Sequence, residues 1–576
     1  MTTSVLTNLT TITPADVTAA VVFFPNGSLL AVEIGNNVTE IASAAFGNRT
    51  TLTSVTIKSA ANNKLRTIGT GAFLSCTSLQ SIALSEASSI LTIESSAFLS
   101  CLGAAGTLTI PGSVATISTS AFESCISVQS IALDEATSLQ TISPFAFLSC
   151  LSAAGTLTIP GSVATIGVGA FSDCTSLQSI ALDGATSLQT IESSAFESCT
   201  SATGTLTIPG SVATIGNNGF LNCDSVQSIA LDGATSLQTI GPSAFSGCTS
   251  ATGTLTIPGS VALIDVAAFR GCNSLQSIAL DGATSLQTLE RDAFIFCGSA
   301  TGTLTIPGSV TFIRLAAFRF CNSFQSIALD GATSLKLIDR LSFQSCASAT
   351  GTLTIPGSVT IIGSAAFGNC TSLQSIALDG ATSLQSLDND VFFSCVSATG
   401  TLTIPGSVAS IGRTAFFGCT SLQSIALDGA TSLQLIEQDA FLSCLSATGT
   451  LTIPGSVASI GTDAFRECRS LQSIALDGAT SLQTIGQSAF SGCTSATGTL
   501  TIPGSVATIG SGAFVGITDL TSISFVSSAT NVTIALGAFD TAASITNLEW
   551  VGTGTTIGTL NGGVTFNRDA PSVNFV

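Results

Sequence analysis

The chain has 576 residues, of which only 8% are charged, and 14 Lys and Arg against 33 Asp and Glu give a formal net charge of −19. Nucleic-acid binding depends on clustered cations that neutralise phosphates, so this composition excludes nucleic acid as an expected partner and disfavours anionic membrane surfaces. No apolar run approaches the roughly 18 residues of a membrane-spanning helix, so we expect no membrane insertion.

Residues 1–28 lack the repeat that dominates the rest of the chain. They carry Pro14, Pro25 and Gly27 and are expected to form an N-terminal cap that covers the open edge of the first coil. The first ten residues show neither a basic segment nor the apolar segment that follows it in a conventional signal peptide. The compartment is therefore unknown from these residues.

Residues 29–550 form a repeat array. The segment Thr203–Ile215 continues into Phe220 and Cys223 and recurs nearly verbatim every 49 residues, and it alternates with a second segment, Leu177–Ile191. Both segments lead to the same Phe-x-x-Cys, so the structural unit is a coil of alternately 24 and 25 residues. A fixed period of this length predicts a solenoid, here of about 21 coils stacked on one continuous core. Residues 551–576 are expected to be a C-terminal cap of short strands.

Each coil contains two inward-facing segments. Leu177, Ile180 and Leu182 alternate with polar or small residues, which predicts a strand with one buried face in a parallel β-sheet. Asp183–Gly184 in one coil and Pro209–Gly210 in the next are typical of turns. The spacing of Ala-Phe-x-x-Cys suits one short helical or 3₁₀ turn that buries Phe and Cys together.

The segment Ile208–Gly216, followed by Phe-x-x-Cys, resembles the BspA-like or Treponema-type leucine-rich repeats. This resemblance implies a right-handed solenoid with a parallel sheet along its concave side. It also implies a role in adhesion, because proteins of this class act at the surfaces of mucosal bacteria and parasitic protists. The alternate coils depart from the family pattern, since Leu-Asp-Gly-Ala-Thr-Ser-Leu replaces Ile-Pro-Gly-Ser-Val. A cell-surface or secreted location follows from the resemblance, whereas free cysteines would suit the cytoplasm.

The eighteen cysteines fall once per coil and form a ladder. Stacked side chains point the same way and rarely reach disulfide geometry, and cysteine also serves as a small buried apolar residue. We therefore expect free buried thiols, with disulfide pairs or a thiophilic metal as the alternatives. The ladder comprises Cys76, Cys101, Cys125, Cys150, Cys174, Cys199, Cys223, Cys248, Cys272, Cys297, Cys321, Cys346, Cys370, Cys395, Cys419, Cys444, Cys468 and Cys493.

Two polar rows also recur with the repeat. Seven aspartates stand 49 residues apart from Asp183 to Asp477, and such a row could indicate a calcium site. Neighbouring aspartates of the row are two coils apart, however, so the row alone cannot surround one ion. A role in the turns is favoured. A threonine row runs from Thr92 to Thr239 and breaks at Leu263. It is read as ordinary solvated strand threonine, with ice binding as an alternative.

The composition argues against an enzyme. With no His and no Tyr in the chain, Ser-His and Cys-His nucleophile pairs and His-bound metals are impossible. No Asp or Glu departs from the periodic background in a way that would build a pocket. We expect no catalytic residues, no metal site and no cofactor.

The repeats stop agreeing between residues 263 and 340, where small uncharged positions become large or cationic. Six of the 14 Lys and Arg fall in this stretch. Arg and aromatic residues are enriched at binding hot spots, so the stretch is a candidate contact patch, with sequence drift as the alternative. Its members are Arg270, Arg291, Phe312, Arg314, Arg319, Phe320, Phe324, Lys336 and Arg340.

These observations favour a non-catalytic repeat protein that presents a long surface to protein or glycan partners, as an adhesion protein does. A self-assembling rod or fibre subunit is the first alternative, because the coils are nearly identical. An ice-binding solenoid is the second.

Overall fold

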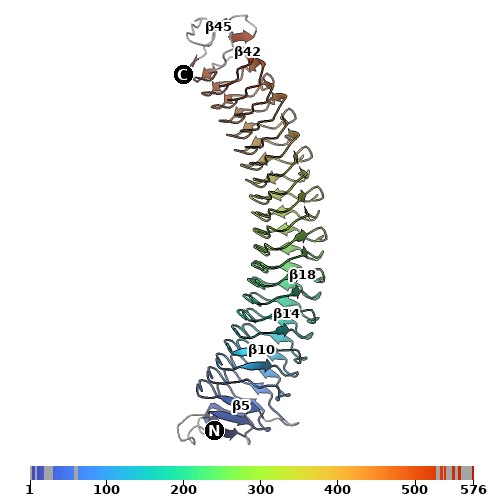
Figure 1. The fold of residues 1–576 in the computed structure, drawn as a ribbon, viewed down its shortest axis with the longest axis vertical. Coiled ribbons are helices and arrows are strands. Elements are labelled where there is room, and N and C mark those ends of the chain that lie inside the picture. Colours follow the sequence, from blue (N-terminus) through green and yellow to red (C-terminus); the bar gives the residue numbers. More distant parts are fainter. Residues whose placement is uncertain are drawn as a thin grey trace. The chain divides into compact units, whose positions relative to one another are not determined.

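The computed structural model describes residues 3–6, 9–17, 30–57, 63–526, 532–535, 537–539, 548–551, 556–558 and 574–575. The chain divides into two units, residues 1–286 and 287–576. Within each unit, successive coils stack on one another through parallel strands (Figure 1). The expected β-solenoid is thus confirmed.

Each coil contributes one two-residue strand to a parallel, in-register sheet. In unit 1 these strands are β2 (Thr11–Ile12), β4 (Glu40–Ile41), β6 (Thr67–Ile68), β7 (Thr92–Ile93), β9 (Thr116–Ile117), β11 (Thr141–Ile142), β13 (Thr165–Ile166), β15 (Thr190–Ile191), β17 (Thr214–Ile215), β19 (Thr239–Ile240) and β21 (Leu263–Ile264). In unit 2 they are β23 (Thr288–Leu289), β25 (Phe312–Ile313), β27 (Leu337–Ile338), β29 (Ile361–Ile362), β31 (Ser386–Leu387), β33 (Ser410–Ile411), β35 (Leu435–Ile436), β37 (Ser459–Ile460), β39 (Thr484–Ile485), β41 (Thr508–Ile509), β43 (Thr533–Ile534) and β46 (Asn574–Phe575). In the two-residue strands from β2 to β43, the second residue faces the core and the first faces outward.

Longer strands form separate small parallel sheets, most of them pairs. Those of unit 1 are β1 (Thr3–Leu6), β3 (Ala31–Ile34) and β5 (Ser54–Ile57), then the pairs β8 (Gly106–Thr109) with β10 (Val128–Ala132), β12 (Thr156–Thr158) with β14 (Ser179–Ala181), β16 (Thr205–Thr207) with β18 (Ser228–Ala230), and β20 (Thr254–Thr256) with β22 (Ser277–Ala279). Those of unit 2 are the pairs β24 (Thr303–Thr305) with β26 (Ser326–Ala328), β28 (Thr352–Thr354) with β30 (Ser375–Ala377), β32 (Thr401–Thr403) with β34 (Ser424–Ala426), and β36 (Thr450–Thr452) with β38 (Ser473–Ala475), then β40 (Gly498–Ile502), β42 (Leu520–Val526), β44 (Leu548–Val551) and β45 (Thr556–Gly558). Strand β45 is antiparallel to β44.

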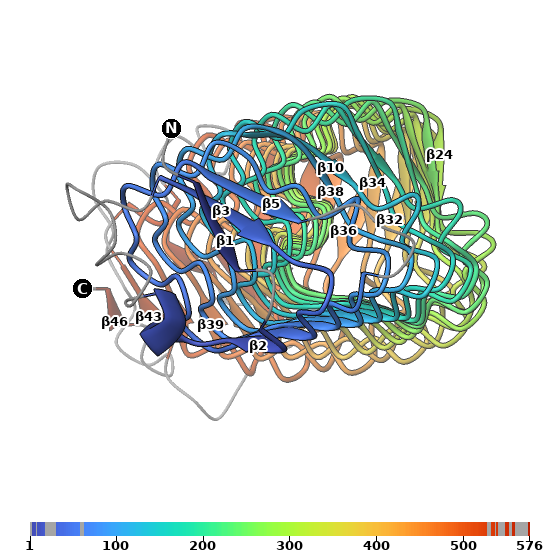
Figure 2. The same cartoon turned by 90° about the horizontal axis from the view of Figure 1, so that it is seen from below.

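The described part of the predicted N-terminal cap continues both sheets by one layer. Strand β1 pairs in register with β3, and β2 pairs with β4; Figure 2 shows β1, β3 and β5 side by side. Residues 14–17 form one helical turn. Thr13 caps it, because the Asp16 N–H donates to Thr13 Oγ1 over 3.4 Å and the Thr13 N–H donates to Asp16 Oδ2 over 2.9 Å. Residues 18–29, and most of the predicted C-terminal cap at 551–576, lie outside the described residues.

The Ala-Phe-x-x-Cys segments are β-turns rather than the helical or 3₁₀ turns that we expected. The Phe98 N–H donates to Ala121 O in the next coil over 2.7 Å, whereas the Leu99 N–H donates to Ser96 O in its own coil over 3.1 Å. Ser96 and Ser100 have φ of 56° and 60°. Since a 3₁₀ helix needs negative φ throughout, these left-handed residues break the helix and turn the chain back to the next strand.

The core consists of identical rows of side chains. One Phe per coil stacks on the Phe of the next coil; the ring centroids of Phe196 and Phe220, for example, lie 5.2 Å apart with nearly parallel planes. From β2 to β43, the second residue of each two-residue strand, such as Ile191 or Ile215, is buried beside this stack. Every coil therefore buries the same apolar set, which explains why the sequence repeats so closely.

Candidate binding surface

The cysteine ladder lies in the core. All eighteen cysteines are free and buried. In unit 1, each ladder thiol donates a hydrogen bond to the backbone carbonyl of the Phe in the preceding coil, over 3.1 to 3.6 Å. In unit 2, Cys321 makes the same bond to Phe294 O over 3.2 Å. The thiols thus link neighbouring coils.

Burial makes these thiols poor nucleophiles. Loss of solvation raises the pKa of Cys125 and Cys223 in unit 1, and of Cys370 and Cys419 in unit 2, from the ordinary value near 9 to about 12. The reactive form of cysteine is the thiolate. A raised pKa therefore keeps the ladder protonated and inert at neutral pH.

The seven periodic aspartates lie at exposed turns. Within the described residues, no group of three or more His, Cys, Asp or Glu side chains is arranged to hold a metal ion. Asp428 instead borders an open groove of about 360 Å³, which Thr431, Thr452, Gly455 and Gly478 also line. The groove is open and its lining is largely apolar, with Ile453 and Pro454 beside the polar residues, and no pair of side chains in it is placed for acid–base chemistry.

The outward row of the two-residue strands is uniform over most of unit 1, between Glu40 and Leu263. Threonines pair in register from strand to strand without interruption over eight coils. They are Thr67, Thr92, Thr116, Thr141, Thr165, Thr190, Thr214 and Thr239. The row is one residue wide, because the next residue of every strand is a buried Ile.

The same row becomes apolar in unit 2. Phe312 pairs with Leu337, and Leu337 pairs with Ile361, in three consecutive coils. Ile361 leaves 40% of its surface exposed, and Phe312 and Leu337 are half-buried. A contiguous apolar row on an outer face is typical of a contact surface.

Two arginines of the predicted patch stack on its phenylalanines. The Arg314 guanidinium lies 4.6 Å from the centroid of the Phe312 ring, and that of Arg319 lies 4.5 Å from the Phe320 ring. Arg319 Nε also donates to Gln344 Oε1 over 2.7 Å. On its other side, Phe320 stacks on Phe296 with the centroids 5.2 Å apart. Stacking of this kind holds the guanidinium planes in place and leaves N–H groups free for a partner.

The other residues of the predicted contact patch differ in their exposure to solvent. Arg291, Lys336 and Arg340 are exposed in unit 2, and Arg270 is exposed in unit 1. Phe324 does not belong to the surface, because it is fully buried and packs edge-on against the core ring of Phe318 at 6.3 Å. It occupies the position of a buried Leu in the other coils, 49 residues after Leu275. That offset could have revealed its place from the sequence.

Two surface residues escaped the sequence analysis. Phe296 is 43% exposed, and it stands one coil before Phe320 at a position that Ser, Asn or Gly fills in most coils. Ile361 continues the apolar row beyond Leu337. Both could have been found by aligning every coil on its core Phe. We call the following exposed or half-buried residues of unit 2 the belt: Arg291, Phe296, Phe312, Arg314, Arg319, Phe320, Lys336, Leu337, Arg340 and Ile361.

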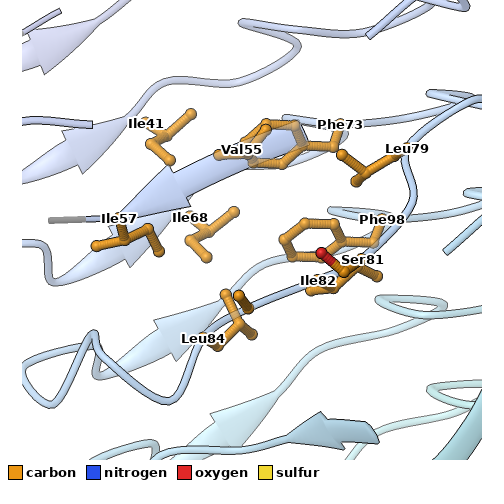
Figure 3. Close-up of a pocket in the computed structure, with 11 residues that line it drawn as sticks. Ile41, Val55, Ile57, Ile68, Phe73, Leu79, Ser81, Ile82, Leu84 and Phe98 are labelled. Carbon is orange, nitrogen blue, oxygen red and sulfur yellow. The ribbon is translucent and has the colours of Figure 1, made fainter. Parts of the chain in front are cut away.

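A small cavity in the core of unit 1 is too small for a ligand. An apolar cavity of about 10 Å³ lies in unit 1, where Ile41, Ile57, Phe73, Leu79 and Phe98 point toward one another (Figure 3). A volume of about 10–15 Å³ holds one water molecule at most. The gap accompanies the loss of strand pairing at residues 81–84. Among the described residues, no helix has the length and apolar content needed to cross a membrane.

Comparisons with known proteins found similar solved structures. A leucine-rich repeat protein from Bacteroides ovatus is 23% identical, with 72% of this chain and 83% of that chain covered and a TM-score of 0.37. A leucine-rich cell-surface protein from Faecalibacterium prausnitzii is 21% identical over 78% and 79% of the two chains, with a TM-score of 0.21. A leucine-rich repeat protein of T. pallidum is 24% identical over 38% and 78%, with a TM-score of 0.23. No curated protein sequence matches the chain.

The sequence profile of the BspA type leucine-rich repeat region matches six times, over residues 19–150, 91–227, 189–325, 238–352, 336–450 and 434–560. These matches span nearly the whole array. The earlier resemblance is thereby confirmed, and the chain belongs to the family of BspA type leucine-rich repeat proteins.

Proposed function

We propose that this protein is a non-catalytic binding scaffold that presents the belt to a protein or glycan partner, in the manner of a surface adhesion protein. Membership of a leucine-rich repeat family supports binding or surface presentation in general. The belt supplies the particular surface, because in it neighbouring coils bring together exposed or half-buried aromatic and cationic side chains.

The observation that carries this proposal is the backbone conformation of two belt residues. Phe296 and Phe320 have φ of 65° and 63°. A bulky residue in the left-handed region costs about 1–2 kcal/mol relative to glycine. Gly271 and Gly418 meet the same geometric demand in other coils without that cost. Phe296 is exposed and Phe320 is half-buried, and backbone strain of this kind clusters at binding sites.

The charges of the belt favour an anionic partner. Among the described residues, Arg314, Arg319, Lys336 and Arg340 make no ion pair, although the whole chain carries a net charge of −19. The guanidinium groups of Arg314 and Arg319 are already oriented by the rings beneath them. Preorganised arginines bind carboxylate, sulfate or phosphate groups through paired N–H donors.

A binding screen with a matched variant tests the proposal. The purified protein is applied to a glycan array and to an array of extracellular proteins, in parallel with a variant carrying Arg314→Gly, Arg319→Leu and Phe320→Asn. These replacements are the residues 98 positions earlier, Gly216, Leu221 and Asn222. We expect the parent protein to bind at least one array member and the variant to lose that signal.

Thermal denaturation of both proteins provides the control. The variant should melt at the same temperature or slightly higher, because Asn tolerates positive φ better than Phe. Equal binding of parent and variant, or no binding of the parent to either array, would refute the belt as the contact surface.

A further inference from the structure

We propose that the belt recognises the Asp-Gly turns of a second copy of this chain, so that the protein associates with itself through arginines of one copy and aspartates of another. This inference rests on the proposed function, because it names the partner of the same surface.

The cations of the belt and the aspartates of the turn row repeat at the same spacing. Arg291 and Arg340 stand at the same position of their coils, 49 residues apart. The intervening core rings of unit 2 are separated by steps of 5.2 and 5.4 Å. Asp379 and Asp428 are also 49 residues apart, and the rings of their coils are separated by steps of 5.4 and 5.2 Å. A cation every second coil can therefore meet a carboxylate every second coil without strain.

The belt and the aspartate row carry opposite charges. The seven aspartates of the turn row are exposed, and none of them makes an ion pair among the described residues. Arg340 makes none either, and Arg291 makes only an exposed 3.6 Å contact with the adjacent Asp292. Exposed pairs of this kind contribute little within one chain. Both rows are thus available to a partner of opposite charge.

The surface beside one of these aspartates is hollowed into a groove. The groove at Asp428 holds about 360 Å³, enough to admit a guanidinium group, and its walls include the Thr431 and Thr452 hydroxyls. Gly478 opens it, because a side chain at that position would meet no atom within 4 Å. Gly429 has the same open space in the preceding coil pair. An arginine from a second copy would find a carboxylate, hydroxyl acceptors and room for its plane.

A charge-swap experiment tests the inference. Sedimentation velocity of the intact protein across a concentration series should show self-association that weakens as salt is added, since salt screens exposed charges. One variant carries Arg291→Glu and Arg340→Glu, and in a second all seven aspartates of the turn row, from Asp183 to Asp477, are replaced by Arg. Each variant alone should associate about tenfold or more weakly than the parent. An equimolar mixture of the two should recover the complex, because each then offers the surface that the other lacks.

A variant with Lys64→Glu and Arg66→Glu is the charge-matched control, since both residues are exposed far along the sequence from the belt. It should associate like the parent. A parent that remains monomeric throughout, or a mixture that shows no complex, would overturn the second-copy inference. Those outcomes leave the array result for Arg314, Arg319 and Phe320 untouched, so the two proposals fail independently.

Discussion

The outward residues of the two-residue strands differ between two parts of this protein. Between Thr67 and Thr239 in unit 1, every outward residue is threonine, whereas unit 2 places Phe312, Leu337 and Ile361 in three successive coils. The inward residue is Ile in all of these strands. The fold therefore constrains only the inward row, because that row alone is buried in the shared core.

The outward row is free to vary, and its variation is where function can arise. Replacing threonine by Phe or Leu changes no core contact, but it creates an apolar surface that water solvates poorly. The regular coils of unit 1 show that stability requires the buried inward row. The belt of unit 2 shows that the outward positions can carry apolar residues while that inward row stays the same.

The largest effect should come from alkaline pH, and it should strike both units alike. Burial raises the pKa of Cys125 and Cys223 in unit 1, and of Cys370 and Cys419 in unit 2, to about 12. A buried thiol that stays neutral stabilises the folded state fully below pH about 9. That contribution is lost as the pH rises from about 9 towards 12, because the unfolded chain releases its protons first.

Thermal melting between pH about 7 and 11 checks this expectation. The melting temperature should fall steeply above pH about 9, and the chain has no Tyr to titrate in that range. Thiol titration at neutral pH should find almost no reactive cysteine in the folded protein and eighteen after denaturation without reductant. Ready reaction in the folded state, or a flat melting profile, would contradict the buried ladder.

The next largest effect separates the inward from the outward row. Ile215→Ala in unit 1 and Ile338→Ala in unit 2 should each lower the free energy of unfolding by about 2–5 kcal/mol, because each leaves a cavity in the core. Thr214→Ser and Phe312→Thr in the same strands should change it by no more than about 0.5 kcal/mol. Chemical denaturation measures all four. A large loss from Phe312→Thr would mean that the belt serves folding.

A smaller effect is expected in the cysteine ladder. Cys272→Ser should destabilise the array by about 1 kcal/mol, at the low end of the roughly 1–3 kcal/mol for burying a hydroxyl. The reason is that the hydroxyl can still donate to Phe245 O, which the thiol reaches at 3.2 Å. Cys272→Ala, which donates nothing, is the comparison. Chemical denaturation that gives equal losses for both would show that the hydrogen bond has no role.

The smallest effect has the opposite sign. Phe296→Gly should raise the free energy of unfolding by up to about 1 kcal/mol, because relief of the left-handed strain outweighs the added freedom of the unfolded chain. Ser198→Gly, at the same coil position with φ of 59°, is the matched control in unit 1. A clear loss of stability in thermal denaturation of Phe296→Gly alone would place that ring in the folding core rather than on the contact surface.

Much of the fold was predictable from the repeat. The alternation of Leu177, Ile180 and Leu182 predicted a one-sided strand, and the structure has β14 there with Ile180 buried. The turn after the core Phe was predicted wrongly as helical. A 3₁₀ helix and a β-turn both have a backbone hydrogen bond from residue i to residue i−3. Only the positive φ of residues such as Ser198 distinguishes the β-turn from the helix.

The candidate surface was only partly predictable. Sequence comparison between coils identified Arg314, Arg319 and Phe320 as deviations, but it could not show that Arg319 lies over Phe320 or that Phe296 stacks beneath it. It also counted Phe324, which is in the core. A departure from the repeat marks a position, and it does not tell on which side of the coil that position lies.

The sequence by itself determined the coil, its period and the rows of Ile, Phe and Cys, because every coil meets the same neighbours and must bury the same residues. Only the tertiary structure decided how those rows bond and which outer residues meet. The thiols donate to the carbonyls of the preceding coil, and the arginines stack on rings brought near by the turns. Such contacts depend on backbone conformation at the turns and on the stacking of adjacent coils, which a one-dimensional period does not encode.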